Sequence, residues 1–189
     1  MLVQETISHK TLQELEAGLH EILAAPKQKG ELAMIVRRPE KLEREELQEG
    51  ELNEALGLVG DNWLARSSEG SPNARPEPDT QLTLMNTRAV QLMAGERVRW
   101  KLAGDQLYVD LDLSKENLPP GTRLSVGSAV LEVTAVPHTG CKKFVERFGM
   151  DAMIFVNSPT AKDLRLRGMY AKVVKPGTLK VGDIIQKIS

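Results

Sequence analysis

The sequence contains one cysteine, Cys141, in 189 residues. A single cysteine cannot form an internal disulfide or build a cysteine-rich zinc site, and its scarcity suits a reducing cytoplasm. An excess of charge is also absent, because 25 basic and 26 acidic residues give a formal net charge of −1. Since the chain has no basic block, its composition does not indicate a nucleic-acid partner.

Long apolar runs are missing too. The N-terminal stretch "MLVQETISHK" lacks the apolar core of a signal peptide, and no later segment is long enough to span a bilayer. The sequence has no P-loop, no GxGxxG after a strand, no HExxH and no GxSxG motif. We therefore expect a cytoplasmic protein with no membrane partner, long enough for one domain with a small elaboration.

The first third of the chain alternates between helical and strand patterns. Residues 11–25 have apolar side chains at helical spacing, and Thr11 with Glu14 forms a capping-box pattern at the start. Residues 31–38 are a short apolar run with β-branched members, which predicts a strand. The acidic segment 39–58 predicts partly helical structure, and the acidic run 43–54 predicts an exposed helix face.

A loop rich in Pro and Gly covers residues 67–79, and a loop of this length is expected to be either mobile or functional. Residues 80–85 predict a strand. Asn86 then caps a short helix, which Gly95 ends.

The second half of the chain favours a barrel. Residues 107–113 alternate apolar and polar side chains, as one strand does on a half-buried sheet. Residues 120–133 and 176–188 form a near-repeat of Pro-Gly-Thr, a strand, Val-Gly and a β-branched strand. The predicted fold is mixed α/β to mainly β, a β-barrel core with several peripheral helices. We expect an N-terminal helical extension over 1–30 and the barrel domain over 31–189.

The stretch "HTGCKKF" places the only thiol between a turn and a predicted helix that begins near Cys141 and ends before Gly149. Free N–H groups and the macrodipole at a helix N-terminus favour an anion. Lys142 and His138 are close in sequence, so all these features favour the thiolate form of the cysteine. The position suits a reactive thiolate or a soft-metal ligand, and the same helix end also suits a phosphate.

Other interpretations of these residues stay open. A lone cysteine is often a small buried hydrophobic residue, although the polar neighbours of Cys141 favour a functional role. His138 is a candidate general base, an oriented hydrogen-bond donor or a turn residue.

Further candidates come from arginines and from one turn. Arginine suits bidentate recognition of phosphate, but any single arginine is also a common solvated surface residue. In "GDNW", Asp61 and Asn62 follow a glycine turn and either orient a ligand or cap a loop. The arginine candidates are Arg66, Arg75, Arg88, Arg165 and Arg167.

Taken together, these residues resemble the MOSC domain family, named for the C-terminal part of molybdenum cofactor sulfurases. The resemblance extends from about residue 34 to the end of the chain. It is carried by the order and spacing of "GLVGDNW", "QLTLMN", "GDQLYVDLDL", "PGTRLSVGSAVLEVT", "HTGCKKF" and "LRLRGMYAKVVKPGTLKVGDIIQKI".

The resemblance implies a barrel-like fold with one cysteine, Cys141, near a cleft. It also implies binding of a molybdenum–pterin cofactor (molybdopterin) or transport of sulfur for it, and some members reduce N-hydroxylated compounds together with redox partners. Full-length sulfurases carry a pyridoxal-phosphate domain that 189 residues cannot hold. We expect a stand-alone member, with pyridoxal phosphate only on a separate partner protein.

The leading hypothesis is a molybdenum-cofactor protein in which Cys141 is the metal ligand or a persulfide carrier and His138 tunes it. The protein would act as an oxidoreductase or a sulfur transferase, with a redox or sulfur-donor protein as partner. The alternatives are a non-catalytic cofactor storage or delivery module and an interaction domain in which Cys141 is structural. The predicted cofactor contacts are Lys142, Arg66, Arg88, Arg167, Asp61 and Asn62.

Overall fold

The computed structural model describes residues 8–67 and 76–189, in which strands form one large and one small sheet. The strands of the large sheet are β1 (Lys29–Arg37), β2 (Glu45–Leu47), β5 (Leu82–Asn86), β6 (Leu107–Val109), β7 (Arg123–Val126), β8 (Ala129–Val133), β9 (Met169–Lys175) and β11 (Ile184–Lys187). The small sheet contains β3 (Glu49–Asn53), β4 (Gly57–Leu58) and β10 (Gly177–Lys180).

The large sheet closes into a barrel. Its strand order is β11-β7-β8-β9-β5-β6-β1-β2, and β11 also pairs with β1. Within the described residues this makes a ring of seven strands, with β2 added at one end of β1. The pairs are antiparallel except for β5 and β6, which are parallel. The predicted β-barrel with peripheral helices is therefore confirmed.

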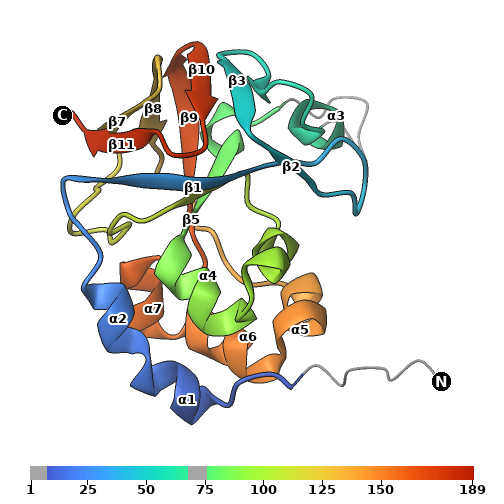
Figure 1. Cartoon of the computed structure of the whole chain (residues 1–189), viewed down its shortest axis with the longest axis vertical. Coiled ribbons are helices and arrows are strands. Elements are labelled where there is room, and N and C mark those ends of the chain that lie inside the picture. Colours follow the sequence, from blue (N-terminus) through green and yellow to red (C-terminus); the bar gives the residue numbers. More distant parts are fainter. Residues whose placement is uncertain (1–7, 68–75) are drawn as a thin grey trace.

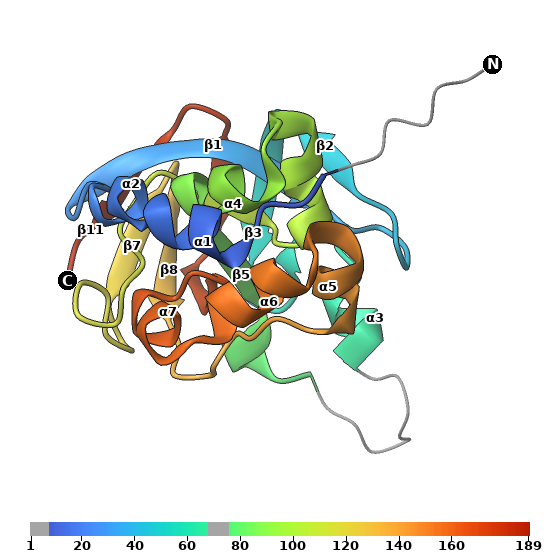
Figure 2. The same cartoon turned by 90° about the horizontal axis from the view of Figure 1, so that it is seen from below.

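Helices gather on one side of the barrel (Figures 1 and 2). They are α1 (Leu12–Ala17), α2 (Leu19–Leu23), α4 (Thr87–Ala94), α5 (Lys142–Phe148), α6 (Met150–Asn157) and α7 (Pro159–Leu164). A further helix, α3 (Trp63–Ser67), lies near β3 on another side, and two 3₁₀ segments, η1 (Pro78–Thr80) and η2 (Arg97–Ala103), complete the elements. No helix of the described residues is long and apolar enough to cross a membrane.

Two hydrophobic clusters share the strands between them. Along β6, Leu107 and Val109 point into the barrel cluster, whereas Tyr108 between them packs in the cluster under the helices. In β5, Leu84 and Met85 divide in the same way. Successive side chains of a strand point to opposite faces, so strands covered on both sides are apolar along most of their length.

Several predicted local signals are confirmed. The side chain of Asn86 accepts from the backbone N–H groups of Arg88 and Ala89 and caps α4, which ends at Gly95. The capping box at Thr11 is present, but the predicted helix over 11–25 is divided at Gly18 into α1 and α2.

The near-repeat forms two strand–turn–strand units as predicted, with different partners. The first unit is the β7–β8 hairpin, while the second separates, because β10 pairs with β3 and β11 joins the barrel. The helical prediction for 39–58 is wrong. This segment forms β2, β3 and β4, and in β3 the buried residues Gly50 and Leu52 alternate with exposed glutamates. The alternation of buried and exposed residues in β3 is so short that the spacing of the acidic residues also fits one face of a helix.

Candidate functional site

A cavity of about 430 Å³ lies where the barrel meets α3 and α5. We call it the cationic cavity. Polar and aromatic side chains complete it, among them Trp63, Thr83, His138, Cys141 and Tyr170. Its cationic side chains come from six places in the chain, namely Arg38, Arg44, Arg66, Lys143, Arg147 and Arg167.

The charged side chains that line this cavity are all cationic, and two of them, Arg38 and Arg167, are paired with buried carboxylates that lie outside the lining. Within the described part of the chain, no aspartate or glutamate belongs to its lining. The like charges also influence one another. Burial, followed by the nearby Arg147 and Arg38, lowers the pKa of Arg44. A concave surface of this kind attracts anions, because low-dielectric walls concentrate the field of its cations.

Cys141 lies at the start of α5, as predicted. It is the N-cap residue, its side chain makes no capping hydrogen bond, and the thiol is free and exposed. The turn before it is held by Asn157 of α6, whose Oδ1 accepts from the backbone N–H of Gly140 at 3.1 Å. Phe144 and Phe148 are buried and fix α5 against the helical layer. The fold thus presents the sulfur at the cationic cavity.

Two buried ion pairs support this cavity. Asp61 accepts from Arg38 Nε and Nη2 at 2.8 and 2.7 Å, and it also accepts from the backbone of Trp63 at the start of α3. Asp105 accepts from Arg167 Nη1 at 2.8 Å. Both carboxylates are fully buried, so each arginine is held in a fixed orientation by its partner.

His138 lies beside the second pair. Its Nδ1 is 3.6 Å from Asp105 Oδ1, too long for a hydrogen bond, and its ring tilts against that of Tyr170 at 4.7 Å between centroids. Burial, followed by Arg167 and Arg38, holds the pKa of His138 well below its usual value. The imidazole is therefore neutral at neutral pH.

Some buried polar atoms around the cavity have no hydrogen-bond partner. Among the described residues these include Nε of Arg44 and of Arg167, Nδ1 of His138 and Oδ1 of Asp105. Unsatisfied buried polar atoms are costly, so several of them around one cavity indicate a place for a ligand.

The structure brings together only part of the predicted site. Cys141, His138, Arg66 and Arg167 all line the cationic cavity. Asp61 does not line the cavity, because its carboxylate is paired with Arg38. Asn62 does not line it either, although its buried Oδ1 lacks a hydrogen-bond partner.

Two predicted arginines and one lysine lie outside the lining of this cavity. Lys142 is exposed but does not belong to the lining, which its neighbour Lys143 reaches instead. Arg88 of α4 lines a different cavity, and its Nε donates to Asp110 Oδ1 at 2.7 Å. Arg165 donates to the backbone oxygen of Leu118. Arg75 and most of the predicted loop 67–79 lie outside the described residues.

The prediction missed Arg38, Arg44, Lys143 and Arg147. Lys143 and Arg147 are four residues apart, and this spacing places them on one face of the helix that begins at the cysteine. For Arg38 and Arg44, which flank a turn between β1 and β2, no local signal was available.

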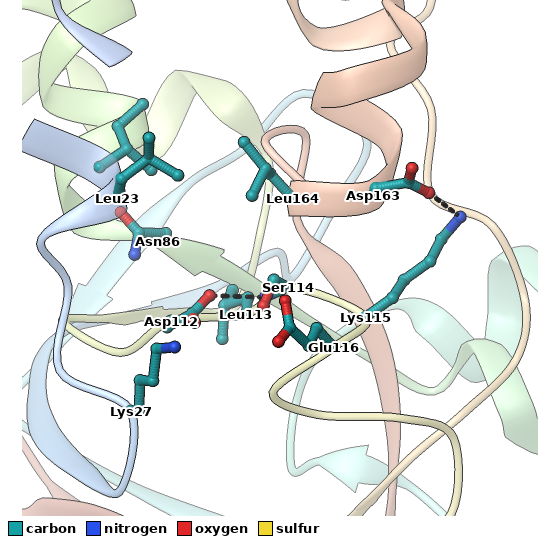
Figure 3. A pocket seen from close by; sticks show the side chains of 11 residues that line it. Leu23, Lys27, Asn86, Asp112, Leu113, Ser114, Lys115, Glu116, Asp163 and Leu164 are labelled. Atoms are coloured by element: carbon teal, nitrogen blue, oxygen red, sulfur yellow. Dashed lines mark hydrogen bonds and ion pairs between the residues drawn. The ribbon is translucent and has the colours of Figure 1, made fainter. Parts of the chain in front are cut away.

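Another cavity contrasts with this one (Figure 3). It encloses about 400 Å³ between α2, α7 and the segment after β6. Its charged residues have both signs, with Lys115 paired to Asp163 at 3.0 Å and Asp112 accepting from the backbone of Ser114. Because these charges compensate one another, this cavity has no comparable preference for anions. No cluster of three or more His, Cys, Asp or Glu that could hold a metal ion occurs in residues 8–67 and 76–189.

Comparison with known proteins gives the family. Solved structures with similar folds include YuaD from Bacillus subtilis, at a TM-score of 0.60 and 14% identity over 84% of this chain and 95% of that chain. YiiM from Escherichia coli has a TM-score of 0.54 and 22% identity, over 84% of this chain and 70% of that one. YiiM from Geobacillus stearothermophilus has a TM-score of 0.53 and 12% identity, over 85% of this chain and 75% of that one.

No curated protein sequence matches this chain. The family model of the MOSC domain matches residues 74–186, more than half of the chain and including the cysteine helix. This protein therefore belongs to the MOSC domain family.

Proposed function

We propose that this protein binds a molybdenum–pterin cofactor in the cationic cavity, with Cys141 as the thiolate ligand of the metal or as a persulfide carrier. One observation carries the proposal. An exposed thiol lies at the edge of a cavity that six cationic side chains line and to which no carboxylate of the described chain contributes. The MOSC family is commonly linked to this cofactor, which supports the same interpretation.

The residues present fit such a ligand at both of its ends. A pterin cofactor carries a terminal phosphate, and the unpartnered Nε groups of Arg44 and Arg167 are donors that a phosphate or a pterin carbonyl would satisfy. It also carries a metal bound by dithiolene sulfurs, for which a thiolate is a suitable further ligand. One thiol is too few to hold a metal alone, so a metal at Cys141 would bring most of its ligands with it.

The proposed role of each residue follows from its position in the cavity. Lys143 and Arg147 lie on the helix of Cys141, and Arg44 lies close to Arg147, so these three form the proposed anion contacts. Arg38 and Arg167, fixed by their buried carboxylates, would hold the remaining polar edge of the ligand. His138, neutral and buried, would offer a ring nitrogen without adding charge. When bound, the cofactor supplies a centre for two-electron redox chemistry or sulfur transfer.

Two versions of the proposal differ in catalysis. As an enzyme the protein would reduce N-hydroxylated compounds or transfer sulfur, with a redox or sulfur-donor protein as partner. As a carrier it would store or deliver the cofactor. The exposure of Cys141 and its lack of any side-chain capping bond argue against the third possibility, a purely structural cysteine.

The central experiment is purification without air from a cofactor-producing host, followed by metal and pterin analysis. We expect both components to co-purify, and the Cys141→Ser variant to lose most of the metal while it keeps its fold. If neither component co-purifies and added cofactor is not retained, the proposal is wrong. If Cys141→Ser keeps full metal occupancy, the thiolate is not the ligand.

The adjacent lysines give a matched test of the anion contacts. Pyrophosphate should raise the unfolding temperature of the cofactor-free protein, because a ligand that binds only the folded state stabilises it. Lys143→Ala should reduce this rise, whereas Lys142→Ala should leave it unchanged, since only Lys143 lines the cavity. Equal effects of the two substitutions would contradict the assigned contacts.

Turnover separates enzyme from carrier. The loaded protein is given an N-hydroxylated substrate and an artificial electron donor, and product is measured. A carrier would instead transfer cofactor to an empty acceptor protein without turnover.

A further inference from the structure

A second cavity lies against the cationic one. It encloses about 400 Å³ between α6, α7 and the segment that follows β8. Four residues line both cavities, which makes them the wall between the two: Pro137, His138, Thr139 and Arg167. We call this second space the apolar cavity.

Its lining is mostly hydrocarbon. Val156, Ala161 and Met169 are buried in its lining. The side chains of Val156 and Ala161 are pure hydrocarbon, and the Met169 sulfur already accepts from Arg165 Nη1 at 3.6 Å. A thioether and an imidazole both make favourable contacts with aromatic rings, and Met169 and His138 supply them here. The remaining apolar lining residues are Pro120, Ala135, Val136 and Pro137.

Three of the four cationic side chains that the described chain contributes to this cavity already have partners. Arg165 donates to the backbone oxygens of Leu113 and Leu118 at 3.2 and 2.7 Å. Lys115 pairs with Asp163, and Arg167 pairs with Asp105. In the described residues no aspartate or glutamate lines the space, so a cationic ligand would find no counter-charge. The fourth cation, Lys162, is exposed to solvent on α7. An anionic ligand inside the cavity would therefore lose its hydration against side chains that are mostly apolar or already paired.

We propose that the apolar cavity binds an uncharged aromatic or heteroaromatic molecule and presents it across His138 to whatever the cationic cavity holds. The volume suits one ring system, since small-molecule sites begin at about 300 Å³. The inference rests on the proposed function in one respect, that a cofactor in the cationic cavity would be the reaction partner of this molecule. Occupancy of the apolar cavity itself does not need the cofactor.

Three probes of nearly equal shape test the chemical class: benzamide, benzamidinium and benzoate. Ligand-observed NMR titrations of the cofactor-free protein should give saturable binding of benzamide, and at least about tenfold weaker binding of benzamidinium. Any binding of benzoate should be lost in Lys143→Glu, because it would occur in the cationic cavity.

Two tryptophan substitutions locate the binding. Ala135 is exposed and lines the apolar cavity but not the cationic cavity. Ala135→Trp should therefore block the apolar cavity without disturbing the core. This change should weaken benzamide binding at least about tenfold. Ala55→Trp, at an exposed turn between β3 and β4, should leave it unchanged.

Several results would overturn the inference. One is that benzamide shows no saturable binding, and another is that the two tryptophan variants bind it with equal affinity. A third is that a charged probe binds more tightly than benzamide and that Ala135→Trp abolishes this binding. Loss of benzamide binding on loading with cofactor would also overturn it, because part of the cofactor would then fill the apolar cavity. A failure of cofactor retention, by contrast, would refute the proposed function and leave the benzamide titrations as they are.

Discussion

At the scale of single residues, His138 has an unusual setting. Its imidazole is buried between Arg167, Arg38 and Tyr170, and its nearest carboxylate, Asp105, is itself taken by Arg167. A buried imidazole near two guanidinium groups loses more from protonation than it gains from a carboxylate at 3.6 Å. The ring is thus kept neutral by its surroundings, which suits a group that contacts a ligand in a cationic cavity.

This setting predicts a pH dependence of stability. The folded-state pKa of His138 lies well below 6.5, so below about pH 6.5 the unfolded chain binds the additional proton. The free energy of unfolding should therefore fall as the pH falls, by about 1 kcal/mol between about pH 7 and 5.5. The measurement is urea denaturation of wild type and His138→Gln across this range.

Asp105 changes the pH dependence of stability in the opposite direction, because burial raises the pKa of its carboxyl group despite the nearby Arg167. It is present in both proteins, so the difference between the two curves isolates the histidine. His20→Gln, which changes an exposed residue of α2, serves as the control and should follow wild type. A His138→Gln curve parallel to that of wild type would contradict the prediction.

At the scale of elements, the residue that precedes β9, Gly168, determines how closely this strand packs beneath the cationic cavity. Gly168 has φ +101°, and a Cβ there would come within 2.5 Å of the backbone oxygen of Leu84 in β5. The same Cβ would lie 3.3 Å from Asp105 Oδ1 and from His138 Nδ1. Glycine at this position lets β9 approach β5 and leaves room for the buried carboxylate and the imidazole.

Gly168 and Gly182 have similar φ angles, so alanine substitutions at the two positions distinguish the cost of backbone strain from the cost of a steric clash. Gly182 has φ +94°, but a Cβ there would meet nothing within 4 Å. Gly182→Ala should cost about 1–2 kcal/mol, the usual penalty for a side chain in left-handed backbone. Gly168→Ala should cost about 1–3 kcal/mol more, because it also forces backbone atoms apart. Chemical denaturation measures both, and equal losses would show that the contact with Leu84 is unimportant.

At the scale of the whole molecule, closure of the barrel determines what lies near Cys141. Strand β11 closes the ring, since its Ile185 is opposite Gly30 of β1 and Val126 of β7. The closed ring fixes β1, β5 and β9 relative to one another. Arg38, Thr83 and Arg167 therefore converge on one cavity although they are far apart in the sequence.

Neighbouring isoleucines of β11 test this closure. Ile185 is fully buried in the barrel, whereas Ile184 is 54% exposed. Ile185→Asn should destabilise the fold by about 3–5 kcal/mol, because it leaves a buried amide unsatisfied and a void in the core. Ile184→Asn should change stability by no more than about 0.5 kcal/mol. Thermal and urea unfolding would decide, and similar losses at both positions would mean that β11 does not close the barrel as described.

The site could be predicted from the sequence only where its signals are local. The polar heptad around Cys141 predicted a helix that starts at the thiol, and α5 begins at the next residue. Lys142 was predicted as the cofactor contact, whereas Lys143 lines the cationic cavity, because the choice between them depends on which side of α5 faces the barrel. Arg88, also predicted as a cofactor contact, does not line this cavity, and only the fold brings Asp110 within reach of it.

The sequence by itself determined the local architecture: the cap at Asn86, the turns of the near-repeat, the thiol at a helix start and a barrel rather than a doubly wound sheet. Each of these follows from residues close to one another, through capping, positive φ or side-chain alternation. Only the tertiary structure decided which cations gather around the thiol and that no carboxylate of the described chain joins them. The physical reason is that convergence depends on strand pairing between distant segments, which the side chains of any one segment do not specify.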